Sequence, residues 1–325
     1  MKILVTGSDG QLGQCLQKIL TSEDELKTVL PNKEDFALSY FFTTRDNFDI
    51  AGNDVEEVLS DIMPDVVINC AAYTDTYGAE ENPEKAFMVN TYGVSNIAMA
   101  CNKLGIKLIH ISTDFVFDGE KSSPYTVEDK CHPINMYGVT KYFGEKYVQS
   151  LCPNAIIVRT SWLYSEFGNN FVKKIIDRLN KKDYMAYVYD EVSTPTYAMN
   201  LAKFLILLAI RDFMVVDPLY HIKGIYHFTD NGVASRYDFA KAIEEIYFGE
   251  DRGLVCACLS GNNDSSIKRP KYSVLDNTRG VRMMIEYKSE SWRTALKKCI
   301  DRIKMEEPHE GSGEMIFYDK GEICE

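Results

Sequence analysis

Four short runs of apolar, largely β-branched residues recur along the first half of the chain, and longer segments with helical periodicity separate them. The apolar runs cover residues 3–6, 65–70, 107–112 and 155–159. Strands that are apolar on both faces are typical of parallel sheets, which helices cover on each side. Helical periodicity over residues 11–20, 55–62, 83–104 and 135–150 supplies that cover. The pattern predicts an α/β fold built on a doubly wound parallel sheet with right-handed crossovers.

The regular alternation loosens after residue 160. Helices are predicted over residues 171–180, 198–210, 235–248 and 290–303, with a strand over 224–228. A length of 325 residues is enough for two domains in one compact body. We therefore predict a first domain over residues 1–160, a smaller mixed α/β lobe mainly over 161–303, and an acidic flexible tail over 304–325. Part of 190–222 is expected to pack on the first domain.

Charge and composition exclude several classes of partner. The chain has 36 Lys and Arg against 48 Asp and Glu, a net charge of -12. Such an acidic protein is not expected to bind nucleic acid or an anionic membrane. Its nine cysteines form no CxxC pair, and no apolar stretch reaches the ~20 residues of a membrane span. A cytoplasmic protein with reduced cysteines is predicted.

A glycine-rich turn, TGSDGQLG over residues 6–13, joins the first strand to the first helix. Gly7, Gly10 and Gly13 form a GxxGxxG pattern. Glycines let the backbone approach a pyrophosphate, whose charge is stabilised at the N-terminus of the following helix. The position between a strand and a helix favours a dinucleotide site in a Rossmann-like domain over an ordinary turn. The GxxGxxG spacing favours the short-chain dehydrogenases/reductases.

The second strand bears on the choice of cofactor. If it covers residues 40–44, Arg45 follows it and could pair with the 2′-phosphate of NADPH, where an acid would favour NADH. Two alternatives stay open, because residues 27–30 could be the strand and Arg45 could be solvated beside Asp46. NADPH is therefore predicted, with NADH as the alternative.

A YxxxK pair, Tyr137 and Lys141, lies on the helix predicted over residues 135–150. Side chains at i and i+4 share one helix face, so the ammonium of Lys141 is expected to lower the pKa of the phenol of Tyr137. Tyr137 would then act as the general acid that protonates a carbonyl oxygen. Thr113 ends an apolar strand at the carboxyl edge of the sheet, where ligands of such folds bind.

With these motifs in place, the chain resembles the dTDP-4-dehydrorhamnose reductase family of extended short-chain reductases. The resemblance covers about residues 1–303 and is most specific in the second half. It rests on segments 6–13 (TGSDGQLG), 69–74 (NCAAYT), 110–119 (HISTDFVFDG), 137–141 (YGVTK), 159–164 (RTSWLY), 168–171 (GNNF), 194–197 (TPTY), 224–228 (GIYHF) and 269–276 (RPKYSVLD).

The resemblance implies reduction of the C4 ketone of dTDP-4-dehydro-6-deoxy-L-mannose to dTDP-L-rhamnose, with hydride from a nicotinamide. It implies that Thr113 orients the carbonyl, Tyr137 donates the proton and Lys141 holds the nicotinamide ribose. The cofactor-binding positions are then Gly7, Gly10, Gln11, Leu12, Gly13, Arg45, Asp49, Ile50, Ala71, Ala72, Tyr73, Tyr137 and Lys141. The substrate-binding positions are Thr74, Thr113, Asp114, Trp162 and Asn170. Family members sometimes depend on Mg²⁺ at a dimer contact, but spacing identifies no metal ligand here, and a homodimer stays open.

Three departures from the family pattern concern the substrate side. Residues 74–80 read TDTYGAE, Phe115 stands where tyrosine is usual, and Ser165 replaces a common glycine. Two alternatives are weighed against the reductase. One is a non-catalytic NADP-binding regulatory subunit resembling the methionine adenosyltransferase β subunit. The other is an epimerase, a dehydratase or a reductase of a related sugar nucleotide; Phe115 after Asp114 argues against the acid pair common in dehydratases.

Overall fold

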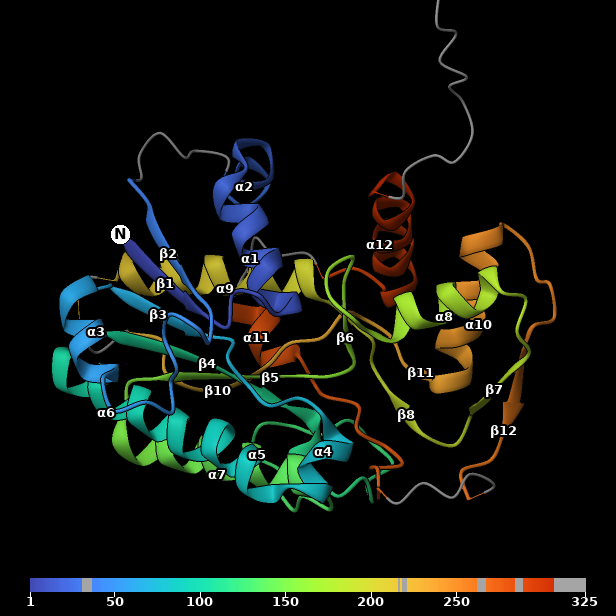
Figure 1. The fold of residues 1–325 in the computed structure, drawn as a ribbon, viewed down its shortest axis with the longest axis horizontal. Coiled ribbons are helices and arrows are strands. Elements are labelled where there is room, and N and C mark those ends of the chain that lie inside the picture. The colour runs from blue at the N-terminus through green and yellow to red at the C-terminus, as the bar shows by residue number, and fades with distance from the viewer. Residues whose placement is uncertain (31–36, 216, 218–220, 262–266, 284–288, 307–325) are drawn as a thin grey trace, which may run out of the picture.

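The computed structural model describes residues 1–30, 37–215, 217, 221–261, 267–283 and 289–306 (Figure 1). Its centre is a six-stranded, wholly parallel sheet in the order β10-β5-β4-β3-β1-β2. The strands are β1 Lys2–Thr6, β2 Ser39–Thr43, β3 Val66–Asn69, β4 Lys107–Thr113, β5 Ile156–Thr160 and β10 Gly224–His227. The strand order reverses between β1 and β3, which is where open α/β sheets bind ligands at their carboxyl edge. The predicted doubly wound sheet is confirmed.

Helices cover both faces of this sheet, as the continuously apolar strands require (Figure 1). One face packs against α1 Gln11–Thr21 and α9 Ala198–Phe213, with Ile3 and Val5 pointing into that core. The opposite face packs against α3 Val55–Ile62 and α6 Val94–Leu104, with Leu4 pointing into that core. α7 Met136–Leu151 packs beside α6. Alternate residues of β1 thus serve the two cores, as the period of a strand dictates.

Two expectations about elements need correction, and one open alternative about the second strand is decided. The strand predicted over 224–228 joins the main sheet beside β5, so the smaller lobe is not one continuous segment. Residues 27–30 are not the second strand, because α2 Glu23–Val29 covers most of them and β2 follows later. The helix predicted over 83–104 is divided into α5 Pro83–Phe87, a π-helical segment η2 Met88–Gly93, and α6.

The π-helical segment is explained by Asn90, a polar residue buried at its centre. The Asn90 side chain accepts a hydrogen bond from the Tyr73 amide at 2.8 Å and donates to the Thr140 hydroxyl at 3.0 Å. A buried amide needs such partners, and this arrangement joins the segment after β3 to α7. π-helical turns are found mostly at functional sites, and this one lies behind the loop that carries Tyr73.

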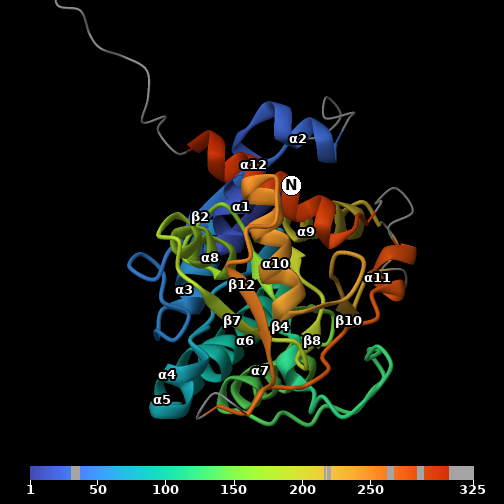
Figure 2. The same cartoon turned by 90° about the vertical axis from the view of Figure 1, so that its right-hand side faces the viewer.

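The smaller lobe is assembled from short strands and helices (Figure 2). Its elements are β6 Leu163–Tyr164, α8 Phe171–Asn180, β7 Met185–Val188, β8 Val192–Ser193, β9 Thr196–Tyr197, β11 Ala234–Ser235, α10 Arg236–Phe248, β12 Val255–Cys258 and α12 Trp292–Glu306. The helix α11 Thr278–Met283 packs instead against β10 of the main sheet. Two short elements flank the cleft from the first domain, α4 Thr76–Glu81 and η3 Asp114–Val116. Of the predicted tail, residues 304–306 continue α12, and 307–325 lie outside the described residues.

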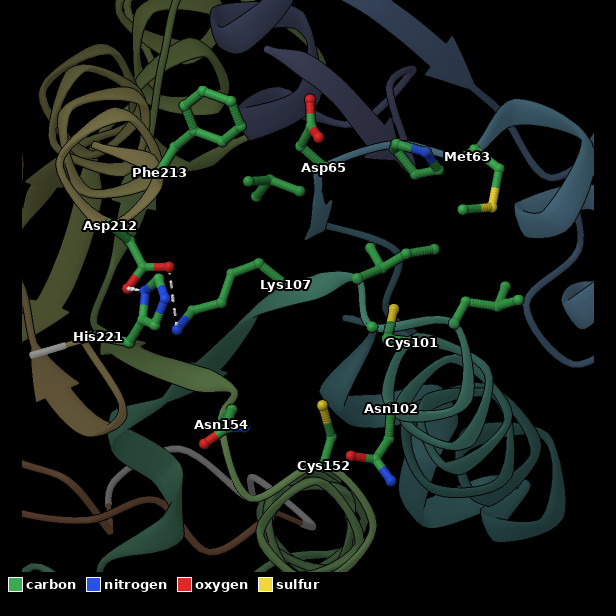
Figure 3. A pocket seen from close by; sticks show the side chains of 15 residues that line it. Met63, Asp65, Cys101, Asn102, Lys107, Cys152, Asn154, Asp212, Phe213 and His221 are labelled. Carbon is green, nitrogen blue, oxygen red and sulfur yellow. Dashed lines mark hydrogen bonds and ion pairs between the residues drawn. The ribbon is translucent and has the colours of Figure 1, made fainter. Parts of the chain in front are cut away.

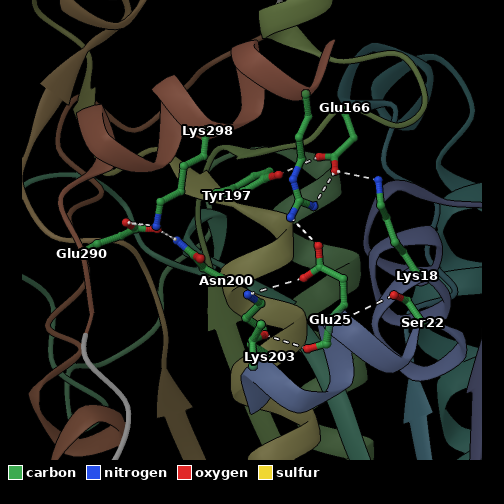
Figure 4. Close-up of polar contacts among 11 residues, drawn as sticks. Lys18, Ser22, Glu25, Glu166, Tyr197, Asn200, Lys203, Glu290 and Lys298 are labelled. Atoms are coloured by element: carbon green, nitrogen blue, oxygen red, sulfur yellow. Dashed lines mark hydrogen bonds and ion pairs between the residues drawn. The ribbon is translucent and has the colours of Figure 1, made fainter. Parts of the chain in front are cut away.

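A buried carboxylate connects the last helix to the first two (Figure 4). Glu166, in the loop between β6 and α8, accepts hydrogen bonds from the Tyr197 hydroxyl at 2.9 Å and from Arg302 of α12 at 3.1 Å. Arg302 also donates to Glu25 of α2, and the ammonium of Lys18 on α1 lies 3.8 Å from Glu166. The network fixes the loop after β6 against both ends of the described chain.

Candidate active site

The glycine turn after β1 brings backbone atoms close to one another and to the loop after β3. Gly7 has a φ of 63°, and a Cβ on it would lie 2.7 Å from the amide nitrogen of Ala71. A Cβ on Gly13 would lie 2.4 Å from the carbonyl oxygen of Gly7. Gly10 is the N-cap of α1, and no side chain among the described residues caps this helix end. The first N–H groups of α1 are therefore open to an anion, which fits the pyrophosphate of a dinucleotide.

Three polar side chains from different elements meet at a pocket of about 580 Å³ at the carboxyl edge of the sheet. Thr113 is the last residue of β4, and Tyr137 and Lys141 lie one turn apart on α7. Gly138 allows the close approach of α7 to η3, because a Cβ on it would lie 2.2 Å from the carbonyl oxygen of Phe115. The structure thus brings the predicted catalytic residues together.

The expectation for the pKa of Tyr137 is wrong in direction. Burial is the main influence and raises the pKa of the phenol to about 12, while a hydrogen bond with Thr113 lowers it and the charge of Asp114 raises it. The physical reason is desolvation, which disfavours the phenolate in this pocket. Tyr137 therefore keeps its proton at neutral pH.

Lys141 is buried and points its ammonium toward the sheet. Its Nζ donates a hydrogen bond to the carbonyl oxygen of Ile111 at 2.7 Å. Burial lowers its pKa to about 8, opposed by the negative charge of Glu145 one turn further along α7. Glu145 in turn accepts hydrogen bonds from Ser112 at 2.5 Å and from Arg159 at 2.7 and 2.8 Å. A buried polar network thus supports the catalytic helix from behind.

Asp114 is a buried carboxylate at the pocket wall, held by hydroxyl groups from three segments. One oxygen accepts a hydrogen bond from Thr113 at 3.1 Å, and the other accepts from Ser193 at 3.4 Å and from Ser273. Burial raises its pKa to about 6, and these hydrogen bonds oppose the shift. The carboxylate is consequently fixed in orientation.

Trp162 lies where β5 gives way to the smaller lobe, and its backbone is strained. Its φ is 42°, in the left-handed region that bulky residues rarely adopt. Such conformations persist where surrounding structure imposes them and cluster at functional sites. The amide of Thr196 donates a hydrogen bond to the Trp162 carbonyl oxygen at 3.2 Å. The indole is thereby presented along the pocket wall.

Most of the predicted site residues line this pocket. They are Gly7, Gly10, Gln11, Leu12, Gly13, Ala72, Thr74, Thr113, Asp114, Tyr137, Lys141, Trp162 and Asn170. The others lie outside its lining: Arg45, Asp49, Ile50, Ala71 and Tyr73. Arg45 is exposed, with its Nε 3.5 Å from the carboxylate of Asp49, and Ile50 is buried in the core beneath Gly93. Their roles toward a cofactor stay predictions.

Several lining residues were not predicted. Ser112 and Thr160 lie at the carboxyl ends of β4 and β5. Ser161, Gly168 and Asn169 come from the segments between β5 and α8, and Phe171 is the first residue of α8. The Thr160 hydroxyl is buried and has no hydrogen-bond partner among the described residues. The signal that could have found the first two is their place at a strand end, the edge where such sheets bind ligands.

A second pocket, of about 520 Å³, opens at the amino edge of the sheet (Figure 3). Lys107 Nζ lies 3.2 Å from one oxygen of Asp212, and His221 Nδ1 lies 3.3 Å from the other. One carboxylate thus already serves both basic groups. None of the predicted site residues is among the described residues that line this pocket. The pocket at the carboxyl edge is therefore the candidate active site.

The described residues were searched for metal-binding clusters and for helices that could span a membrane, neither of which the sequence predicts. Within it, no three His, Cys, Asp or Glu side chains cluster in a way that could hold a metal ion. Mg²⁺ dependence is thus an expectation from the resemblance alone. No helix within the described ranges has the length and apolar character needed to cross a bilayer.

Comparisons with known proteins agree with this geometry. A family model described as the RmlD substrate binding domain matches residues 1–305. A dTDP-4-dehydrorhamnose reductase from Aggregatibacter actinomycetemcomitans is 35% identical over 301 residues, which is 91% of this chain and 97% of the relative. The crystal structure of a dTDP-4-dehydrorhamnose reductase from Clostridium acetobutylicum is 35% identical, with a TM-score of 0.82 over 94% of this chain and 100% of that chain. The crystal structure of a dTDP-4-dehydrorhamnose reductase from Bacillus anthracis, in complex with NADP, is 32% identical. Its TM-score is 0.80, over 93% of this chain and 99% of that chain.

Proposed function

Because this chain belongs to the RmlD substrate binding domain family, we propose that it reduces the C4 ketone of dTDP-4-dehydro-6-deoxy-L-mannose to dTDP-L-rhamnose with NADPH. The observation that carries the proposal is the convergence of Thr113, Tyr137 and Lys141 on one pocket that also contains the glycine turn. Relatives named dTDP-4-dehydrorhamnose reductase, one of them solved with NADP, support the reaction and the cofactor.

The cofactor fits the first domain. The open N-terminus of α1 and the glycines of the turn would hold its pyrophosphate, and Lys141 would hold the nicotinamide ribose. When bound, NADPH supplies the hydride. Arg45 follows β2, where it would contact the 2′-phosphate after exchanging its exposed ion pair with Asp49. The proposal therefore includes a preference for NADPH over NADH.

Tyr137 supplies the proton that the reduction requires. As the hydride adds to the C4 carbon, the carbonyl oxygen gains negative charge and takes the phenolic proton, giving a C–OH group and a phenolate. A pKa of about 12 keeps the phenol protonated at neutral pH. The alkoxide that develops is more basic than a phenolate, so the transfer runs downhill. The Thr113 hydroxyl, which donates to Asp114 in this structure, would turn its proton to the phenolate oxygen and so stabilise the phenolate that remains.

The surroundings of the reacting groups favour this step. Thr113, Asp114 and Lys141 are buried, so charges at the pocket wall act in a poorly hydrated environment. Thr113 would position the substrate carbonyl, while Asp114 and Trp162 would contact the sugar. Asp114 is already fixed by hydroxyl donors and needs little reorganisation on binding.

The experiment that tests the proposal compares the wild type with Tyr137→Phe. The substrate is dTDP-4-dehydro-6-deoxy-L-mannose generated in situ, and NADPH oxidation is followed at saturating substrate. Loss of the proton donor is expected to lower turnover by about 100-fold or more. NADPH should still bind, because the phenyl ring and Lys141 stay in place. Repeating the assay with NADH tests the assignment of Arg45.

Tyr147→Phe is the matched control, since it removes a hydroxyl from an exposed tyrosine on the same helix. Its turnover should equal that of the wild type. Full turnover in Tyr137→Phe would refute the assigned proton donor. A wild-type protein that binds NADPH but reduces nothing would contradict the reductase and favour the regulatory-subunit alternative.

A further inference from the structure

Arg236, the first residue of α10, packs its guanidinium against two aromatic rings of the candidate pocket. The guanidinium carbon lies 3.9 Å from the centre of the Trp162 ring and 5.2 Å from that of Phe171. Both rings line the pocket. The smaller lobe thus brings a positive charge next to two rings of this pocket.

Arg236 forms no ion pair within the described part of the chain. Its Nε is buried and has no hydrogen-bond partner there. Neither Arg236 nor the neighbouring Arg269 has a carboxylate within 4 Å among the described residues; the guanidinium of Arg269 lies instead 5.8 Å from the Tyr77 ring centre. A buried guanidinium without a counter-ion is costly, so this arrangement calls for an anion.

The charged groups that face Arg236 support the same reading. Burial and the charge of Arg269 lower its pKa to about 10, and the charges of Glu191 and Asp114 oppose that shift. The carboxylate of Asp114 already accepts hydrogen bonds from hydroxyl groups. In a protein with a net charge of -12, Arg236 and Arg269 together form a local concentration of positive charge.

We infer that Arg236 binds the diphosphate of the sugar nucleotide and so positions the substrate, an inference that rests on the proposed function. The planar guanidinium can donate two parallel hydrogen bonds to phosphate oxygens, and Arg269 adds charge. The cofactor has its own phosphate site in the glycine turn of the first domain, so the two anions are held by different lobes. Stacking on Trp162 fixes the guanidinium before the ligand arrives.

Isothermal titration with dTDP and with thymidine, on the wild type and Arg236→Gln, tests the inference. The Kd for dTDP is expected to rise about tenfold to a hundredfold in the variant, the range for a lost charge-assisted hydrogen bond. The Kd for thymidine, which lacks phosphates, should not change, and neither should that for NADPH, which also reports that the variant is folded. Arg236→Lys keeps the charge without the planar fork, and its Kd for dTDP should be intermediate.

Arg252→Gln is the matched control. The Arg252 guanidinium also stacks on an aromatic ring, 3.7 Å from the centre of Phe248, but beyond the far end of the same helix. Its dTDP affinity should equal that of the wild type. Unchanged dTDP affinity in Arg236→Gln would overturn the inference, and so would an equal loss for dTDP and thymidine, which would mean that Arg236 only supports Trp162.

The inference and the proposed function fail separately. A wild type that does not reduce the keto sugar, while Arg236→Gln still weakens dTDP binding selectively, refutes the reaction and supports the diphosphate site. A wild type that turns over normally, with an Arg236→Gln variant of unchanged KM and dTDP affinity, supports the reaction and refutes the diphosphate site.

Discussion

Burial shifts the pKa values of Tyr137 and Lys141, two residues of the candidate active site, in opposite directions. Tyr137 is neutral in its usual state, and burial keeps it so by raising its pKa to about 12. Lys141 is charged in its usual state, and burial lowers its pKa to about 8. Its ammonium therefore loses a proton within the range where activity can be measured, whereas the phenol does not.

A high-pH limb in kcat/KM is the expected consequence. In the free enzyme the Lys141 ammonium is present below about pH 8 and is lost above it, so kcat/KM for NADPH should fall with a one-proton slope as pH rises through about 8. Lys141→Arg, whose guanidinium stays charged, should abolish that limb while retaining part of the turnover. The measurement is a pH profile of both proteins, and a limb near pH 8 that persists in Lys141→Arg would assign it to another group.

For single residues, the sequence predicted which side chains form the candidate site but not the environment that surrounds each of them. The glycine turn, Thr113, Tyr137 and Lys141 follow from motifs and strand ends, and the structure brings them to one pocket. The pKa of Tyr137 could not be predicted, because desolvation depends on which distant segments close the pocket. Arg236 was missed for the same reason, since only the docking of α10 brings it onto Trp162.

Among the elements, the glycine turn and α1 approach each other too closely to leave room for a side chain on Gly13. Gly13→Ala would place a Cβ 2.4 Å from the Gly7 carbonyl oxygen and 2.5 Å from Ser8 Cα, both of them backbone atoms. We expect the free energy of unfolding to fall by about 1–3 kcal/mol, as for other overpacked sites, and the Kd for NADPH to rise. Chemical denaturation and cofactor titration measure the two effects.

Gly10→Ala is the nearby comparison, because its Cβ would meet only the Gly7 carbonyl oxygen, at 3.3 Å. The loss of stability should be clearly smaller than for Gly13→Ala. Equal losses for the two variants would show that helix position, and not backbone contact, sets the cost.

Elements with strong local patterns were predicted closely, and those set by tertiary contacts were not. The helices over 55–62 and 171–180 have the predicted bounds, because nearby residues in the sequence determine both their apolar faces and their ends. The π-helical segment was not predicted; the buried Asn90 within it hydrogen-bonds to Tyr73 and Thr140, which only the tertiary fold brings near. The position of β10 in the main sheet could not be predicted either, because the pairing of β10 with β5 depends on the tertiary fold and not on local sequence.

For the whole molecule, the network around Glu166 joins segments that are distant in sequence (Figure 4). Arg302→Met would leave the Glu166 carboxylate, whose side chain has 0% exposure, without its strongest partner. Removal of one member of a buried ion pair typically costs about 3–5 kcal/mol. We expect a loss near the lower bound, because Lys18 and the Tyr197 hydroxyl remain, and thermal unfolding measures it.

Arg293→Met on the same helix is the control, since its pairing with Glu245 is exposed on both sides. Such surface pairs contribute about 0–1 kcal/mol. If both variants lose equally little stability, the network around Glu166 does not hold the helix in place.

The return of the chain to the main sheet limits how this protein can be divided. Because β10 hydrogen-bonds to β5 and α9 packs on α1, segments from the second half complete the first domain. A single cut near residue 160 would separate the sheet from its sixth strand and strip one face of its cover. Exchange of the substrate lobe between relatives therefore needs several junctions in the sequence. In a chimaera with one junction, β10 and α9 would come from a different relative than the rest of the main sheet and the helices that cover it.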